Sequence, residues 1–240
     1  MMSKVHKRIR TLTVEDLKTI FVSLDTMPGW RGSLARGMCA LYFATGVRPS
    51  ELRRAELADL KLEKMQLYIR HPKGEGSWGI PEDVEIIRED MLPMIVRYLK
   101  EREAYLNKNG ASKVKPLFPC LNRNSKDGFY SAQGFGRIKE KVVEVSGVDF
   151  RLKDFRSTLT SLTVNGDMSL LPAMSAQLRH SNMATTQKHY AAIEQGAAGR
   201  MLRSAWRNTP IMDINTVIKK NSDLLDAKVV DRSGFEPEAS

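Results

Sequence analysis

The chain has 240 residues, 42% hydrophobic and 28% charged, which suits one folded domain with short appendages and excludes a wholly disordered chain. Its 38 lysines and arginines exceed its 28 aspartates and glutamates, and the resulting net charge of +10 favours a polyanionic partner, most often nucleic acid. No apolar run approaches the roughly 18 residues of a membrane span, and no apolar stretch follows the basic start of the chain, which excludes a signal peptide.

The chain divides into three parts. Residues 1–10 are a basic lead with little to bury, residues 11–207 form the main domain, and residues 208–240 hold an amphipathic helix and a tail that we expect to be disordered. The apolar residues of that helix, at 211–225, recur at helical spacing.

The first helices have clear end signals. Thr13 is a good N-cap for a first helix, which Pro28-Gly29 ends. A second helix is predicted over about Ser33–Thr45 with Gly46 as its C-cap, and Pro49–Leu52 starts a short third one.

The pattern changes between residues 60 and 80. Leu67 and Ile69 alternate with polar neighbours, and the turn-forming cluster Pro72–Ser77 follows. These features predict a β-hairpin or small antiparallel sheet with Lys73 at its tip. Apolar periodicity predicts further helices at 90–106, 132–145, 153–164, 169–178 and 184–194, with a loop at 107–128. The predicted fold class is mainly α with a small antiparallel β-sheet.

The metal-binding residue types do not gather in the sequence. Cys39 and Cys120 match no metal or disulfide framework and are expected to be buried, reduced thiols. The acidic residues are scattered, and the histidines lack ligand spacing; they are His6, His71, His180 and His189. We therefore expect no metal and no cofactor.

Two segments in the first half of the domain carry candidate site residues. In Ala44–Leu52, a turn at Gly46 presents Arg48 at a helix start, and Glu51 lies one turn on, where its carboxylate can brace a guanidinium. Lys73 stands at the glycine-flanked tip of the predicted hairpin, directly before Gly74.

Two more segments follow in the second half. Lys153 and Arg156 are three residues apart and share one helical face. The segment Leu178–Tyr190 adds Arg179, His180, His189 and Tyr190. Taken singly, the cations are explained as solvated charges, His180 as a helix cap and Tyr190 as a core aromatic with a wet hydroxyl. Together they favour an anion-binding catalytic site.

These segments resemble the boxes of the tyrosine recombinase (phage integrase) family. The family's first arginine box, Thr-Gly-hydrophobic-Arg-x-Ser-Glu-Leu, is matched at Thr45–Leu52, and its hairpin lysine at Lys73. Its His-x-x-Arg box is matched by Lys153–Arg156, with lysine in place of histidine. Its Leu-Gly-His-Ser…Thr-Thr…Tyr box is matched by Leu178–Tyr190, with Arg179 in place of glycine. The resemblance runs from about residue 12 to residue 207.

Two departures from the family bear on the chemistry. Lys153 stays charged near pH 7 unless it is strongly desolvated, whereas a neutral imidazole accepts a proton. The interval from His180 to Tyr190 is one residue longer than in many relatives, and one residue turns a helix by about 100°. Tyr190 is nevertheless the only tyrosine near that position.

The resemblance implies a metal-free and ATP-independent DNA strand transfer. Tyr190 attacks the scissile phosphate and forms a 3′-phosphotyrosyl link, while Arg48, Arg156 and His180 bind the phosphate oxygens. Lys73 is the implied general acid, and Lys153 supports phosphate charge or proton transfer. His71, Arg179 and His189 are possible DNA contacts, although His71 and His189 suit ordinary surface positions equally well.

The resemblance also implies partners and a location. We expect double-stranded DNA, self-association to a tetramer at synapsis, no membrane, and a cytoplasmic, nucleoid-associated protein. Relatives carry a further DNA-binding domain before the catalytic one, so this chain is expected to be either a piece of a longer protein or a reduced form. Alone it should bind DNA weakly and with strong salt dependence. The helix at 211–225 docks on a neighbouring protomer or on its own domain.

Three interpretations of the function remain open from sequence. The first is an integrase. Two features favour one from an archaeal plasmid or virus: Lys153, and the tail Gly234–Pro237, whose codons can spell a tRNA-like TTCGAAC. The second is a type IB topoisomerase, which uses the same chemistry without a partner site. The third is a non-catalytic DNA-binding module that keeps the fold.

Overall fold

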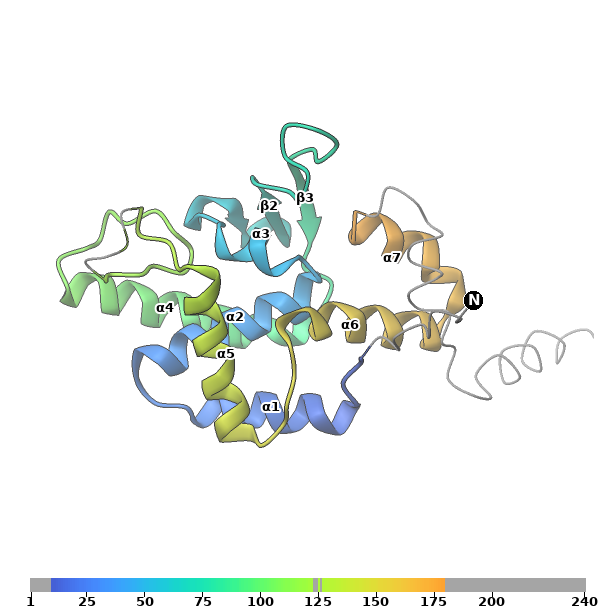
Figure 1. The fold of residues 1–240 in the computed structure, drawn as a ribbon, viewed down its shortest axis with the longest axis horizontal. Coiled ribbons are helices and arrows are strands. Elements are labelled where there is room, and N and C mark those ends of the chain that lie inside the picture. The colour runs from blue at the N-terminus through green and yellow to red at the C-terminus, as the bar shows by residue number, and fades with distance from the viewer. Residues whose placement is uncertain (1–9, 123–124, 126, 180–240) are drawn as a thin grey trace, which may run out of the picture. The chain divides into compact units, whose positions relative to one another are not determined.

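The computed structural model describes residues 10–122, 125 and 127–179, and this part of the chain is mainly helical with a three-stranded antiparallel sheet (Figure 1). The predicted fold class is confirmed. The α-helices are α1 (Val14–Thr26), α2 (Gly29–Thr45), α3 (Pro49–Arg53), α4 (Leu92–Lys108), α5 (Ala132–Ser146), α6 (Leu152–Gly166) and α7 (Leu171–Gln177). The strands are β1 (Leu60–Lys61), β2 (Gln66–Ile69) and β3 (Glu82–Glu85), with 3₁₀ turns η1 (Leu57–Asp59), η2 (Leu62–Lys64), η3 (Glu89–Met91) and η4 (Met168–Leu170).

The helix ends follow local chemistry. Thr13 caps α1 with a complete capping box: its hydroxyl accepts from the Asp16 N–H at 3.0 Å, and the Asp16 carboxylate accepts from the Thr13 N–H at 2.9 Å. Gly46 ends α2 in the left-handed conformation, φ 67°, and its N–H donates to the Tyr42 carbonyl. Pro49 begins α3, where a missing N–H costs nothing. These predictions are confirmed.

Helix α2 is the centre of the core. It begins at Gly29 and not at the predicted Ser33, because Gly29 takes a left-handed φ of 67° right after Pro28 and lets the chain turn directly into the helix. Every residue from Gly32 to Thr45 is buried, and α2 packs against α1, α4, α5 and α6. A helix that is buried all round needs no polar face.

The crossing of α2 and α4 depends on one glycine. A Cβ built on Gly37 would lie 2.3 Å from the buried Tyr98 ring. Gly37→Ala should therefore lower the free energy of unfolding by about 1–3 kcal/mol, as overpacked cores do. Gly136→Ala on α5 is the matched control, because nothing lies within 4 Å of its Cβ position, and it should be neutral or stabilising by up to about 1 kcal/mol. Urea unfolding of both variants measures the difference, and equal stabilities would contradict the close approach.

The sheet has the order β1-β2-β3, and both pairings are antiparallel. Leu67 pairs with Val84 in the β2–β3 register, and both side chains are buried with Ile69. The twelve residues from 70 to 81 join β2 to β3 and project as a loop beyond the strands (Figure 1). Lys73 lies in the first half of this connection, whose middle is Glu75-Gly76, so it is not at the tip as predicted.

Some sequence expectations needed correction. The helix predicted at 90–106 begins with the 3₁₀ turn η3, and the helix predicted at 169–178 consists of η4 followed by α7. Cys39 is a buried free thiol as predicted, but Cys120 is only half-buried because it lies in the loop before α5 and lines a pocket. The helices predicted at 184–194 and 211–225 lie outside the described residues. Within the described residues, no helix has the length and apolar character to cross a bilayer.

Candidate active site

Arg48 stands at the N-terminus of α3, immediately after the turn that Gly46 makes. Its backbone N–H donates to Glu51 Oε2 at 2.8 Å, and its guanidinium Nη1 donates to Glu51 Oε1 at 3.1 Å. The Arg48 side chain keeps 21% exposure, whereas the Glu51 side chain has none. Glu51 therefore braces an arginine that still faces the surface, as the spacing of the two residues predicted.

The Glu51 carboxylate also joins two distant segments to this turn. Its Oε1 accepts from the backbone N–H of Lys73 at 3.2 Å, and its Oε2 accepts from Arg179 Nη2 at 2.5 Å. Burial alone would raise the pKa of the Glu51 carboxyl. The Arg179 guanidinium, together with the N–H and guanidinium of Arg48, outweighs burial and holds that pKa below its ordinary value. Glu51 is thus an ionised carboxylate shared by three segments of the chain.

Lys73 is held at its backbone and exposed at its side chain. Its neighbours form tight turns: Gly74 and Gly76 have positive φ values of 84° and 77°, and the Gly79 N–H donates to the Gly74 carbonyl at 2.8 Å. The loop therefore fixes the Lys73 backbone beside Glu51 while the ammonium group remains in solvent.

Arg156 lies in the first half of α6 and is 9% exposed. Its Nη1 donates to the Gly46 carbonyl and its Nη2 to the Leu178 carbonyl, both at 2.6 Å. These carbonyls belong to the end of α2 and the end of α7, so one guanidinium fixes both segments to α6. Backbone carbonyls at helix ends lack intrahelical donors, which is why a buried arginine suits this place.

One pocket of about 530 Å³ brings three predicted site residues together. Arg48 from α3 and Lys153 and Arg156 from α6 all line it, and Phe135 is among its apolar walls. Lys153 is exposed on the first turn of α6, as its spacing from Arg156 predicted. With Arg53, which also lines this pocket, four cations surround a partly apolar hollow, and they are suited to bind an anion such as a phosphate group.

Of the remaining predicted site residues, His71 and Arg179 lie in the described part of the chain. His71 is half-buried, its Nδ1 lies 2.9 Å from Glu75 Oε1, and its carbonyl accepts from Arg54 at 2.9 Å. The Arg179 side chain is 8% exposed and turned toward Glu51. His180, His189 and Tyr190 lie outside the described residues.

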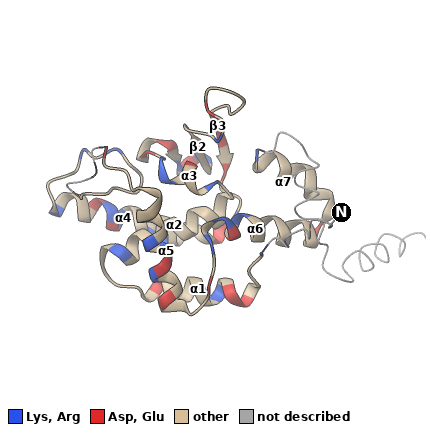
Figure 2. Ribbon diagram, viewed as in Figure 1, with Lys and Arg blue, Asp and Glu red and all other residues tan. Residues whose placement is uncertain are grey.

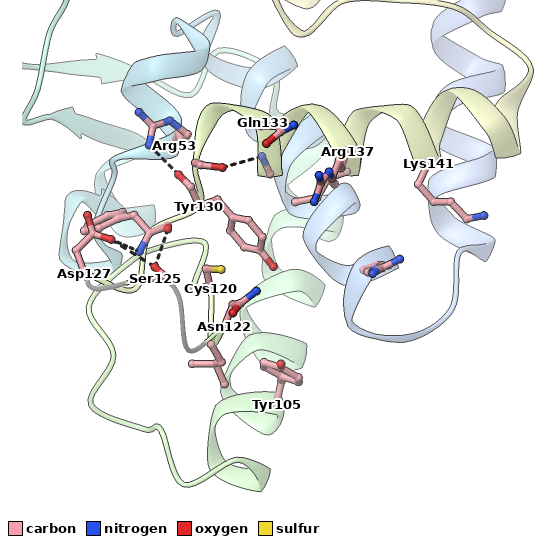
Figure 3. Close-up of a pocket in the computed structure, with 16 residues that line it drawn as sticks. Arg53, Tyr105, Cys120, Asn122, Ser125, Asp127, Tyr130, Gln133, Arg137 and Lys141 are labelled. Carbon is pink, nitrogen blue, oxygen red and sulfur yellow. Dashed lines mark hydrogen bonds between the residues drawn. The ribbon is translucent and has the colours of Figure 1, made fainter.

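A second, larger pocket of about 940 Å³ adjoins the first, and Arg53 lines both. Figure 3 shows Arg53 from α3 and Arg137 and Lys141 from α5 around this pocket, together with the Tyr130 ring. The Arg53 side chain is fixed by a 2.7 Å bond from Nη1 to the Tyr130 carbonyl. Arg31 is a further cation of the lining and Asp127 is its carboxylate.

The residues of this second pocket are not among the site residues predicted from the sequence. The signal was nevertheless present, because Gln133, Arg137 and Lys141 recur at four-residue intervals and so lie on one face of α5. Lysine and arginine residues are coloured blue in Figure 2. The two pockets together form a basic surface that extends from the Arg48–Arg156 site along α5.

Comparison with known proteins shows the family and the fold of this chain. The phage integrase family matches residues 10–196, well over half of the chain. The tyrosine recombinase XerD of Rickettsia bellii (strain RML369-C) is 24% identical over 187 residues, which are 76% of this chain and 59% of the relative. The chain thus spans little more than half the length of this curated relative.

Two solved structures show the same fold. The XerH site-specific recombinase bound to a palindromic difH substrate, in a post-cleavage complex, superposes with a TM-score of 0.60 at 18% identity, covering 86% of this chain and 55% of XerH. A lambda integrase tetramer bound to a Holliday junction superposes with a TM-score of 0.53 at 16% identity, covering 78% of this chain and 49% of the integrase. Because the family match covers residues 10–196, well over half of the chain, the chain belongs to the phage integrase family.

Proposed function

We propose that this chain is the catalytic part of a site-specific DNA recombinase that cuts and rejoins DNA through a 3′-phosphotyrosyl link at Tyr190. The observation that carries the proposal is the meeting of Arg48, Lys153 and Arg156 on one pocket. Arg48 is about 100 positions from Lys153 and Arg156 in the sequence, and it belongs to a different box of the family resemblance from those two. A fold kept only for stability has no need to place these cations, together with Arg53, around one hollow.

In this proposal the pocket binds the scissile phosphate. A phosphodiester carries one negative charge, and its transition state places more charge on the non-bridging oxygens. Arg48 and Arg156 stabilise those oxygens with charge-assisted hydrogen bonds, because each guanidinium is already oriented, Arg48 by Glu51 and Arg156 by two carbonyls. His180 adds a further hydrogen bond.

The chemical step exchanges one phosphate ester for another. The Tyr190 Oη forms a bond to phosphorus while the bond from phosphorus to the 5′ oxygen breaks, and the phenol proton leaves to a neighbouring group. Lys153 supports the phosphate charge or takes part in this transfer. The leaving 5′ oxygen takes a proton from Lys73, whose ammonium group is exposed on its loop. The ester energy is retained in the phosphotyrosine, so rejoining to another strand needs no ATP, metal or cofactor.

The basic surface along α5 supplies contacts to the flanking duplex in this proposal. Arg137→Ala combined with Lys141→Ala should weaken DNA binding and reduce the slope of log affinity against log salt by up to about 2, since each phosphate contact contributes about 0.9. Lys100→Ala on α4 is the control for loss of one surface charge, because Lys100 is exposed and lines neither pocket. Titrations at several salt concentrations measure the slopes. An unchanged slope in the double variant would remove this surface from the DNA interface.

We further propose assembly and a biological role. Lambda integrase forms a tetramer on a Holliday junction, and a similar fold supports a tetramer for this chain at synapsis. Lys153 and the tail Gly234–Pro237 favour integration of an archaeal plasmid or virus into a chromosome, in the cytoplasm at the nucleoid. Sequencing the coding DNA tests the tail, because codons other than those spelling TTCGAAC would end that part of the proposal.

The central experiment traps the covalent intermediate. The protein is incubated with nicked DNA duplexes whose core sequence is randomised. Cleavage beside the nick releases a short DNA end that diffuses away, so the covalent intermediate is not rejoined. The products are separated on a denaturing gel. We expect a protein–DNA adduct whose modified peptide, identified by mass spectrometry, contains Tyr190. Relaxation of supercoiled DNA without exchange between sites would favour a topoisomerase. DNA binding without any adduct would favour a non-catalytic module.

A further inference from the structure

Arg179 has a backbone conformation that is unusual for a residue with a side chain. It follows α7 with a φ of 54°, in the left-handed region, at the position where the family's box has glycine. Residues with a Cβ rarely adopt this conformation because the Cβ approaches the following carbonyl oxygen. The chain keeps an arginine here nonetheless, so its side chain is expected to provide a compensating interaction.

The Arg179 side chain makes that interaction inside the protein. It is 8% exposed, its Nη2 donates to the fully buried Glu51 carboxylate, and its Nε lies 3.9 Å from Glu82 Oε1 on β3. Glu51 belongs to α3, so the ion pair joins residues 128 positions apart in the sequence. The end of α7 is thus fixed twice, once through the Leu178 carbonyl on Arg156 and once through Arg179 on Glu51.

The charge balance gives Arg179 a consequence for Arg48. Glu51 accepts hydrogen bonds from the N–H groups of Arg48 and Lys73 and pairs with the guanidinium of Arg48. With Arg179 present, two arginines share the buried Glu51 carboxylate, while Glu82, whose side chain is 51% exposed, lies 3.9 Å from Arg179 Nε. With an uncharged residue at position 179, the carboxylate would be neutralised by Arg48 alone, and Arg48 would have less charge to offer a phosphate.

We infer that Arg179 is a positioning residue, which binds Glu51 so that Arg48 stays available for the scissile phosphate and the Lys73 loop stays in place. The inference rests on the proposed function, and it differs from the direct DNA contact that the sequence suggested for Arg179. It also gives this chain an interaction that a glycine at the same position cannot provide.

Three variants at position 179 separate charge from backbone effects. Arg179→Met and Arg179→Lys both keep a side chain in the left-handed conformation, but only lysine keeps the charge, and Arg179→Gly restores the family's residue. Single-turnover cleavage by Arg179→Met should be about tenfold slower, with a smaller change in the dissociation constant for DNA, and Arg179→Lys should recover part of the rate. Equal cleavage rates for wild type, Arg179→Met and Arg179→Gly would overturn the inference.

The pH profile provides a readout that a purely structural role would not move. The titratable and charged groups that face Glu51 are Arg48 before α3, Arg179 after α7 and Tyr42 from α2, and Glu82 from β3 lies against Arg179. Arg179 helps to hold the Glu51 pKa below its ordinary value, so cleavage should persist as the pH falls until this lowered pKa is reached. In Arg179→Met the loss on the acid side should begin at higher pH. Adding Glu51→Gln should abolish this loss of cleavage at low pH, because the titrating carboxylate is gone. If the loss began at the same pH in Arg179→Met as in wild type, the inference would be contradicted.

Amide hydrogen exchange distinguishes failure of this inference from failure of the proposed function. The N–H groups of Arg48 and Lys73 donate to Glu51, so both amides should exchange faster in Arg179→Met than in wild type or Arg179→Lys. This measurement needs no cleavage activity. Unchanged exchange at both amides would overturn the positioning by Arg179 even in an active recombinase. Absence of an adduct from wild type, with faster exchange in the variant, would instead overturn the proposed function.

Discussion

Tyr190→Phe should form no covalent DNA adduct, and its strand cleavage should be lower than that of wild type by about 10³-fold or more. The substitution removes only the hydroxyl oxygen that attacks phosphorus and keeps the ring. DNA binding should persist, because the cations of the two pockets are untouched. Adduct formation on nicked duplexes and a parallel binding titration measure the two properties.

The matched control for this loss is Tyr68→Phe on β2. Tyr68 is half-buried in the sheet and lines neither pocket, so the same chemical change there should leave adduct formation intact. If Tyr190→Phe still formed an adduct, another residue would be the nucleophile, and the peptide carrying the DNA would identify it.

Arg156→Lys should lower single-turnover cleavage by about 10²- to 10³-fold, as loss of one preorganised transition-state donor does. Lysine keeps the positive charge but cannot donate to two carbonyls in a fixed plane as a guanidinium does. Arg156→Ala should be slower still. It should also be less stable by about 1–3 kcal/mol, because the buried carbonyls of Gly46 and Leu178 lose their donor. Cleavage under saturating DNA and urea unfolding separate the two effects.

Arg151→Ala is the control for Arg156. Arg151 precedes α6 and pairs with Asp154, but its side chain is 49% exposed and lines neither pocket. Because the Asp154 side chain is 1% exposed and loses its guanidinium donor, we expect a loss of stability of about 1–3 kcal/mol, but a cleavage rate near that of wild type. If Arg156→Lys cleaved as fast as Arg151→Ala, the planar guanidinium would not act in the chemical step.

The candidate site is organised by two residues that each join distant segments. Arg156 bonds to the ends of α2 and α7, and Glu51 bonds to Arg48, the Lys73 backbone and Arg179. Both residues are buried, so their interactions are little weakened by solvent. Together they hold the α2–α3 turn, the β2–β3 connection and the end of α7, which precedes His180, in fixed relation.

Local chemistry in the sequence determined the helix boundaries that short-range signals control. The Thr13 capping box, the left-handed Gly46 and the first-turn Pro49 depend on residues within four positions of each other, and all three appear as predicted. The sequence did not predict the start of α2 or the 3₁₀ turns before α4 and α7. Helix boundaries depend on single turns that many different sequences can adopt, so short-range signals locate them poorly.

The sequence also singled out Arg48, Glu51, Lys153 and Arg156 as candidate site residues, because these residue types stand at fixed spacing in short boxes. Tertiary structure alone decided how the boxes meet: Arg156 bonds to a carbonyl 110 residues away, and Arg179 turns inward to Glu51 instead of outward to solvent. Likewise, only packing shows that Gly37 must be small against Tyr98 and that the α5 cations border a pocket with Arg53. Local spacing determines which residues share a helix face, but partners across the fold are determined by long-range packing, which no short segment of the sequence contains.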